Sequence, residues 1–148
     1  MVNIEQIKKI REETGVSISE CKKALEKAKG DIKKAKEILR KWGENFAKEK
    51  KTREAKKGII ESYIHPGKKI GAMVELHCES DFVASSKEFQ ELAHELCLQI
   101  AAMNPSKANL LLQPWIRDET KMIKDLVDNY IAKLGENIII KRFIRFEI

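Results

Sequence analysis

The stretch Gly58-Ile59-Ile60-Glu61-Ser62-Tyr63-Ile64-His65-Pro66-Gly67-Lys68-Lys69-Ile70-Gly71-Ala72-Met73-Val74-Glu75-Leu76-His77-Cys78 decides the fold class of this 148-residue chain. Two apolar runs, 59–64 and 70–78, flank a turn-forming segment at 65–68, and this pattern is typical of a β-hairpin. Along the second run apolar residues occupy every other position: Ile70, Ala72, Val74, Leu76 and Cys78. We therefore predict two antiparallel strands with one face packed against a core.

Helical patterns follow this hairpin. Ser85-Ser86 predicts the start of a helix and Asn104-Pro105 its end. A last helix is predicted over Asp118–Leu134, closed by Gly135. The chain then ends in an extended segment, whose predicted faces are Ile138, Ile140, Ile144, Phe146 and Ile148 on one side and Lys141, Arg145 and Glu147 on the other, interrupted by Arg142 and Phe143. A small antiparallel sheet packed by helices indicates an α+β core.

Three short amphipathic helices are predicted before the hairpin. Asn3, Ser17 and Asp31 are their expected N-caps, and Gly15 and Gly30 end the first two. Apolar residues recur at helical spacing in the second and third: Ile18, Cys21, Ala24, Leu25 and Ala28, then Ile32, Ala35, Ile38, Leu39 and Trp42. Residues 43–58 contain few apolar side chains, which predicts a linker or an exposed, partly helical connection.

The net charge of +6 belongs to the N-terminal third. Residues 1–52 carry 15 Lys/Arg and 9 Asp/Glu, whereas residues 53–148 carry 14 of each. This asymmetry predicts two domains: 1–52, with three helices and a linker, and 53–148, the α+β core. The first domain is expected to be drawn to an acidic target.

Composition is that of an ordinary globular protein, with 43% apolar and 35% charged residues. No apolar run approaches the roughly 20 residues of a membrane span, and the first residues lack the pattern of a signal or transit peptide. Three cysteines, an odd number, favour buried thiols in a reducing compartment over a disulfide framework. We expect a cytoplasmic protein without membrane contact.

Patterns for covalent chemistry are missing from the sequence. No glycine starts a Gly-x-x-x-x-Gly-Lys phosphate loop, so the chain is not expected to be a GTPase. His77, Cys78, His94 and Cys97 are soft metal ligands, but adjacent strand residues point to opposite faces, so His77 and Cys78 do not easily share a metal. We predict a protein that is not an enzyme and needs no cofactor.

Three interpretations of the basic helices stay open at this point. Three short helices with excess Lys and Arg are compatible with a helix-turn-helix that binds nucleic acid. Glutamates interrupt the lysines, however, and the second and third helices lack base-reading Asn or Gln before residue 43. A solvated charged surface, or a module that binds a protein, fits this pattern better.

The segment Glu79-Ser80-Asp81-Phe82-Val83-Ala84 breaks the local rules, because a strand-to-helix turn is ordinarily polar. One reading makes it a helix start with Ser80 or Asp81 as the cap and Phe82 as apolar filler. The other makes Phe82 an exposed aromatic anchor for a partner's pocket.

Three stretches resemble the family of translation elongation factor Ts. The first is Arg11-Glu12-Glu13-Thr14-Gly15 with Glu20-Cys21-Lys22-Lys23-Ala24-Leu25. The second is Glu75-Leu76-His77-Cys78-Glu79-Ser80-Asp81-Phe82-Val83, and the third runs from Gly135-Glu136-Asn137-Ile138 through Arg142-Phe143-Ile144-Arg145-Phe146-Glu147. They occur in family order and span nearly the whole chain.

The resemblance implies an N-terminal three-helix domain of the ubiquitin-associated type, an α+β core, and the GTPase elongation factor Tu as partner. It implies nucleotide exchange by binding, with Asp81, Phe82 and Val83 inserted near the magnesium and nucleotide site of the GTPase. Arg11, with its apolar neighbours Ile10 and Ile18, matches the family's N-terminal contact positions. His65 matches, more loosely, a hairpin that faces another domain of the partner.

The sequence departs from the family in three places. Ser80 replaces a threonine, and Ser19 stands where methionine is common. Only residues 106–112 separate Pro105 from Gln113, where relatives carry a longer helical segment. Short members with a single core half pair it with a second copy, so we expect a homodimer through the core sheet, with Phe143 and Ile144 at the interface.

Overall fold

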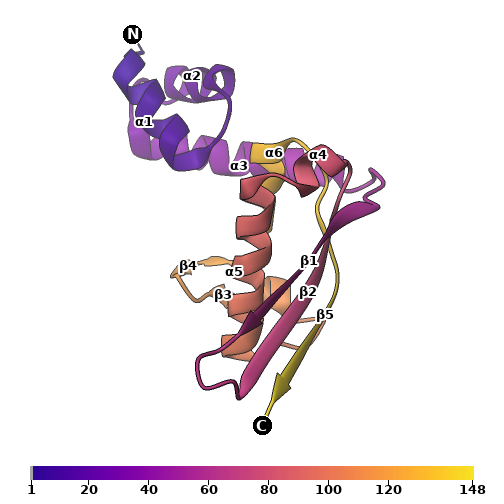
Figure 1. Ribbon diagram of the computed structural model, residues 1–148. Coiled ribbons are helices and arrows are strands. Elements are labelled where there is room, and N and C mark those ends of the chain that lie inside the picture. The colour runs from indigo at the N-terminus through magenta and orange to yellow at the C-terminus, as the bar shows by residue number, and fades with distance from the viewer. Residues whose placement is uncertain (1) are drawn as a thin grey trace.

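The computed structural model describes residues 2–148 (Figure 1). Its N-terminal helices are α1 (Ile4–Thr14), α2 (Ile18–Lys27) and α3 (Ile32–Lys50). The side chains of the predicted caps, Asn3, Ser17 and Asp31, each accept a backbone N–H of their helix. The helices enclose a small core: Ile10, Val16, Cys21, Ala24, Leu25, Ala28, Ala35 and Leu39. The three predicted helices are confirmed, and we call them the N-terminal bundle.

Helix α3 is longer than expected, because residues 43–50 continue it. Trp42 and Phe46 stack with ring centroids 5.1 Å apart, and Gly43 and Ala47 are buried. Ala47 belongs to the core of the following region, where α3 packs on the last helix. Of the two alternatives predicted for residues 43–58, the partly helical connection is confirmed and the linker is wrong for residues 43–50. These residues are not fully exposed as expected, because small and aromatic side chains at helical spacing pack on the core, and only residues 51–56 form the irregular connection. The domain boundary at residue 52 stays a prediction.

The sheet contains β1 (Lys57–Ile64), β2 (Ile70–Cys78) and β5 (Ile139–Glu147), antiparallel and in the order β1-β2-β5. Its inner face packs on α5 (Lys87–Met103), which crosses the sheet in Figure 1. Alternate residues of β2 are buried, as predicted: Ala72, Val74, Leu76 and Cys78. The predicted hairpin, the Ser86 cap and the α+β class are confirmed.

Strand β5 differs from its prediction because of a β-bulge. Glu75 pairs with Arg142, but Leu76 pairs with Ile140, so Lys141 is an extra residue. In a regular strand, odd- and even-numbered residues point to opposite faces. After the extra residue of a bulge, the odd- and even-numbered residues exchange faces. The single apolar face predicted for the tail is therefore wrong.

Residues on either side of the bulge confirm this reversal. Phe143, expected at an outer interface, packs against the core, whereas Ile144 and Phe146 are 48% and 68% exposed on the other face. Arg145 turns inward and its Nε donates to the carbonyl oxygen of Ala101 at 3.0 Å. The guanidinium thus satisfies a free carbonyl in the last turn of α5.

The last helix, α6 (Ile123–Leu134), is shorter than the predicted Asp118–Leu134. Asp118 accepts the N–H of Thr120 at 3.1 Å, which favours a turn, and the segment forms β4 (Asp118–Met122). Asp125 accepts the N–H of Met122 at 2.9 Å and so starts the helix there. The partner of β4 is β3 (Pro114–Trp115), which follows the 3-10 helix η1 (Leu110–Leu112).

Candidate partner-binding site

The turn after β2 presents one aromatic side chain to solvent. We call Glu79–Ala84 the β2–α4 junction; it contains the short helix α4 (Asp81–Ala84). Phe82 is 87% exposed, whereas Val83 and Ala84 are each only 5% exposed and pack in the core. Because Phe82 fills no space in the core, the filler reading of this residue is wrong.

The first residues of the junction decide where Phe82 stands. The Oγ of Ser80 accepts the N–H of Val83 at 3.2 Å, so Ser80 is the N-cap of α4. Asp81 is also exposed, with one carboxylate oxygen 3.8 Å from Nζ of Lys57 on β1. Asp81 and Phe82 therefore point outward from a turn whose two following residues are buried.

A distant segment binds the start of the junction. Glu136, just after α6, accepts the N–H of Glu79 at 3.1 Å, the N–H of Ser80 at 3.0 Å and the hydroxyl of Ser80 at 2.6 Å. In return, the carboxylate of Glu79 accepts the N–H of Asn137 at 2.6 Å and Nε of Arg53 at 2.6 Å. We call these five residues, Arg53, Glu79, Ser80, Glu136 and Asn137, the polar brace.

The polar brace also reaches the connection from the N-terminal bundle. Asn137 is 2% exposed, and its Nδ2 donates to the carbonyl oxygen of Arg53 at 2.8 Å. The brace therefore joins the β2–α4 junction, the turn after α6 and the segment that leads out of α3.

Negative charge gathers around the junction. Burial raises the pKa of the Cys78 thiol to about 11, and the carboxylates of Glu136, Asp81 and Glu79 add to this rise. For Glu79, burial is the largest single influence and raises the pKa of its carboxyl. The N–H of Asn137 and the guanidinium of Arg53 together outweigh burial, so the pKa of Glu79 lies below its ordinary value of 4.5. Glu79 is thus held ionised.

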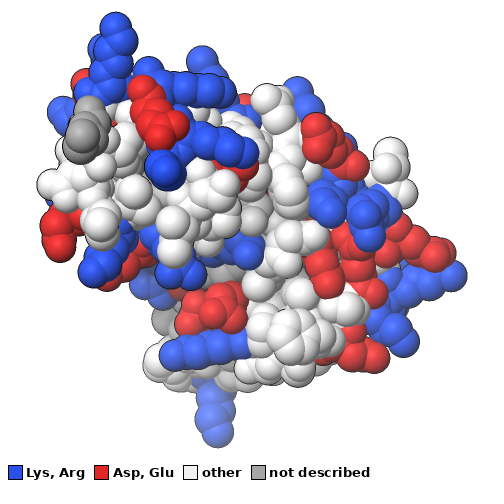
Figure 2. Space-filling model, turned by 90° about the horizontal axis from the view of Figure 1, so that it is seen from above, with Lys and Arg blue, Asp and Glu red and all other residues white. Residues whose placement is uncertain are grey.

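The N-terminal candidates differ in accessibility. Ile10 is fully buried in the bundle, whereas Arg11 is exposed and Ile18 is 55% exposed. Ile4, at the start of α1, is exposed as well. Figure 2 shows Lys and Arg predominating over the bundle end, with Asp and Glu interspersed.

His65 lies far from the junction. It follows β1 at the turn of the hairpin, and its Nδ1 is 2.9 Å from the hydroxyl oxygen of Tyr63. Strand β2 runs from the hairpin turn at Ile70 to the junction at Cys78, which corresponds to roughly 25 Å. His65 and Phe82 therefore lie at opposite ends of the sheet, and the structure does not bring them together.

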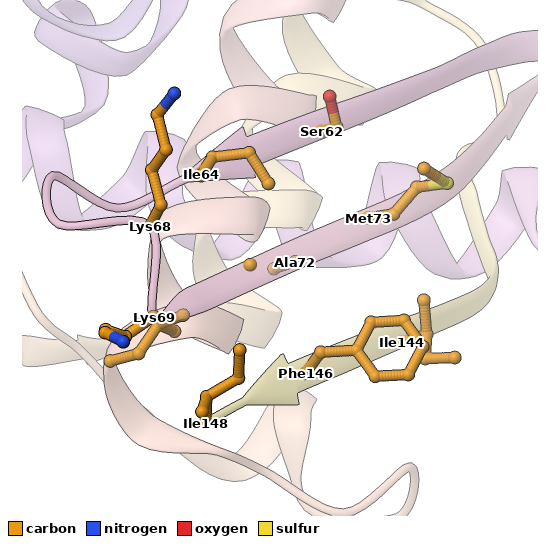
Figure 3. Close-up of a pocket in the computed structure, with 11 residues that line it drawn as sticks. Ser62, Ile64, Lys68, Lys69, Ala72, Met73, Ile144, Phe146 and Ile148 are labelled. Carbon is orange, nitrogen blue, oxygen red and sulfur yellow. The ribbon is translucent and has the colours of Figure 1, made fainter.

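The outer face of the sheet carries apolar side chains that helices do not cover (Figure 3). We define it by Ile60, Ser62, Ile64, Met73, Glu75, His77, Arg142, Ile144 and Phe146. Side chains at the hairpin end line a shallow groove of about 220 Å³, among them Ile64, Met73, Ile144 and Phe146. Sequence reasoning missed this groove because the bulge in β5 was not visible.

Chemistry-bearing clusters are missing from the described part of the chain. Across residues 2–148 no three His, Cys, Asp or Glu side chains lie together as metal ligands. The three cysteines are free and buried, as predicted. Within that same range no helix has the length and apolarity needed to cross a membrane.

Comparison with known proteins matches this arrangement to one family. The family model described as "Elongation factor TS" matches residues 4–106 and 79–148. The chain belongs to the elongation factor Ts family. It is 39% identical to elongation factor Ts of Thermoanaerobacter sp. (strain X514), over 99% of this chain and 95% of the relative. It is 40% identical to the proteins of Thermodesulfovibrio yellowstonii and Thermotoga sp. (strain RQ2), over 99% of this chain and 96% of each relative.

Membership in the elongation factor Ts family makes the chain a translation elongation factor. Elongation factor Ts is a nucleotide exchange factor for elongation factor Tu, and it acts by binding, without covalent chemistry. The family resemblance that Asp81-Phe82-Val83 and Gly135-Glu136-Asn137 predicted is confirmed. The hydrogen bonds that join Glu136 and Asn137 to Glu79 and Ser80, just before Asp81, were not predicted, since no sequence pattern states which segments meet.

Proposed function

We propose that the chain releases GDP from elongation factor Tu by inserting Phe82, with Asp81 beside it, near the magnesium and nucleotide site of the GTPase. The observation that carries this proposal is an almost fully exposed Phe82 on a turn anchored by buried neighbours. Burying a phenylalanine contributes about 1.5–3 kcal/mol, or about one to two factors of ten in an equilibrium constant.

GDP and the exchange factor both bind elongation factor Tu, and the coupling between these two binding events explains why no catalytic group is required. A factor that binds the nucleotide-free GTPase more tightly weakens GDP by the same ratio by which GDP weakens the factor. Mg²⁺ needs nearly ideal octahedral geometry, so a small displacement of its surroundings costs much of its binding. A rigidly held side chain is sufficient for this task.

Val83 takes a different part from the one expected. Since its side chain is buried under the junction, we propose that it anchors α4 and that Asp81 and Phe82 make the contacts.

The burial of Phe82 alone supplies too little free energy for tight binding, so other surfaces of the chain must contribute the rest.

The N-terminal bundle is the first of these surfaces. We assign Arg11 and Ile18 to contacts with the GTPase, and Ile10 to the support of α1 beneath them. The excess of basic residues in this region would steer the factor to an acidic partner. His65 would make a separate contact from the hairpin end.

A homodimer through the outer face of the sheet is also part of the proposal. Uncovered apolar side chains such as Ile64, Ile144 and Phe146 favour a partner on this face. Two sheets pack face to face about 10 Å apart, so a second copy would cover the groove. At micromolar concentration we expect sedimentation as a dimer and a monomer for Ile144→Asp, with Leu112→Asp as the matched control.

We propose no direct role for nucleic acid. Several basic side chains of the bundle are paired with acidic ones: Lys23 with Glu20, Lys36 with Glu13, and Arg40 with Glu37 and Glu44. Salt-sensitive binding of RNA that depends on Lys22–Lys51 would contradict this. A factor that serves translation acts where ribosomes work, so the proposed location is the cytoplasm.

The deciding experiment measures release of a fluorescent GDP analogue from elongation factor Tu. The chain should accelerate release, and Phe82→Ala should lower the acceleration by about 10–100-fold, as loss of a buried phenylalanine implies. Leu112→Ala, which truncates another exposed apolar side chain, is the matched control and should act like the parent. Equal activity of Phe82→Ala and the parent would refute the wedge.

A further inference from the structure

The short helix that carries Phe82 cannot hold itself in place. Helix α4 has only four residues, and isolated helices of this length are unstable in water. Phe82 is exposed, so its own side chain contributes no packing that would fix its direction. The orientation of Phe82 therefore depends on what holds the backbone on both sides of it.

Apolar packing fixes only the later side. Val83 and Ala84 are buried in the core and follow Phe82 in the chain. The earlier side, Glu79 and Ser80, is held by hydrogen bonds. Asn137 and Arg53 bind the side chain of Glu79, and the thiol of Cys78 donates to the carbonyl oxygen of Ser80. The carboxylate of Glu136 binds both residues, through their N–H groups and the hydroxyl of Ser80. Hydrogen bonds to an ionised acceptor are stronger than neutral ones, so this carboxylate is a firm point of attachment.

Ser80 relays this attachment to α4. Its hydroxyl donates to Glu136 and at the same time accepts the N–H of Val83. Its carbonyl oxygen accepts the N–H of Ala84 at 3.1 Å. A continuous hydrogen-bonded path therefore runs from Glu136 through Ser80 to the residue next to Phe82.

The chemistry of Glu136 suits this position. Its two carboxylate oxygens receive three hydrogen bonds, from the N–H of Glu79 and from the N–H and hydroxyl of Ser80. An amide in its place would offer one acceptor oxygen and a nitrogen that only donates. A carboxylate therefore holds both residues at once, where an amide would lose part of the attachment.

We propose that Glu136 is a positioning residue for nucleotide exchange, which holds Ser80 so that Phe82 is presented in one orientation before the partner arrives. This rests on the exchange role proposed above for Phe82. Preorganisation lowers the entropy that a loop loses on binding, and it would spare the factor from ordering its own wedge in the complex. Glu136 itself would not touch the GTPase.

The test compares Glu136→Gln with Glu119→Gln, an exposed carboxylate with no hydrogen bond or ion pair in the structure. Glu136→Gln should lower the GDP-release rate at saturating factor about tenfold, the loss of one charge-assisted hydrogen bond. The half-saturating concentration should change little, since the contacts elsewhere remain. Glu119→Gln should behave like the parent in both.

Amide hydrogen exchange supplies a readout that does not depend on the partner. In Glu136→Gln the amide of Val83 should lose protection about tenfold, while that of Val74 in β2 keeps it. Ser80→Ala should lower the protection of Val83 at least as much, since it removes the acceptor of that N–H itself, and it should also lower the GDP-release rate. Ser80→Thr restores the hydroxyl and should restore both protection and exchange rate.

Each outcome decides the matter. Unchanged Val83 protection and unchanged rate in Glu136→Gln would overturn the proposal, and so would a raised half-saturating concentration with intact protection, which indicates direct contact. If Glu136→Gln does not fold, the Ser80→Ala and Ser80→Thr pair must show loss and recovery, or the proposal fails. If the parent chain does not accelerate GDP release, the proposed function is wrong, and so is the role of Glu136 in exchange. The protection of the Val83 amide would still show whether Glu136 holds the turn.

Discussion

The N-terminal bundle and the α+β core differ in how much apolar surface holds them together. Eight buried apolar residues form the first core, whereas twenty-one form the second. A single core of the first size rarely supplies more than about 3–5 kcal/mol. Helix α3 joins both, since Leu39 lies in one core and Ala47 in the other. The difference indicates that the core is a rigid platform and the bundle a weaker attachment stabilised by contact with it.

The largest effect should come from Leu25→Ala, which removes a fully buried side chain of the bundle. A cavity of this kind costs about 2–5 kcal/mol, close to the entire stability of so small a core. The bundle should unfold while the core stays folded. A thiol reagent should then label Cys21 rapidly and leave Cys97 protected.

The matched control is Leu92→Ala, the same truncation in the larger core. It should lower the denaturant midpoint of the core without exposing Cys97 under native conditions. If Cys21 and Cys97 become reactive together in Leu25→Ala, the two regions unfold as one unit and the contrast between them is wrong.

A smaller effect is expected for Gly58→Ala, which acts on the platform alone. An added Cβ would lie 2.0 Å from the carbonyl oxygen of Leu76, and a backbone atom in a paired strand cannot move away cheaply. Such overpacking costs about 1–3 kcal/mol. Urea denaturation should show this loss for the core, with the labelling rate of Cys21 unchanged.

Ser62→Ala, on the same strand and face, serves as the comparison and should change the midpoint little. Parent-like stability of Gly58→Ala would mean that β1 can shift away from β2, and the platform would be less rigid than described.

The smallest effect concerns the polar brace between the two regions. The pKa of Glu79 is lowered in the folded chain, so its ionised form contributes stability above its ordinary value of 4.5. That contribution disappears as the pH falls below 4.5 through the folded-state pKa. The loss should be about 1 kcal/mol or less, since Arg53 is largely exposed.

This contribution is measured by thermal unfolding at a series of pH values between about 6 and 3, in steps of about half a pH unit. The parent should lose stability more steeply than Glu79→Gln over the acid part of the range. Parallel curves for the two chains would show that Glu79 adds nothing to the join between the bundle and the core.

Local chemistry accounts for what the sequence predicted well. Caps such as Ser17 and Ser86 satisfy free N–H groups within their own turn, and the alternation in β2 follows from a strand with one buried face. These features need only neighbouring residues, and the structure confirms them.

Features that depend on distant partners were not predictable in the same way. The bulge at Lys141 exists only relative to β2, and β4 exists only because β3 pairs with it. Buried Gln99 supports that pair through the carbonyl oxygen of Pro114 and the N–H of Ile116, a contact between separate segments. The contacts of Glu136 with Ser80 are of the same kind.

The outer face of the sheet has a polarity that constrains any second copy seated on it. Rows of side chains at the hairpin end, such as Ser62-Met73-Ile144, are mostly apolar, whereas the next row carries Glu75 bound to Arg142 and His77. A twofold axis places every residue of a face over the same face of its mate. The apolar half of one copy can therefore cover the apolar half of the other only if the axis passes through that half. The charged row of each subunit would then lie at the rim of the interface, in water. From there it would set the angle between the two sheets.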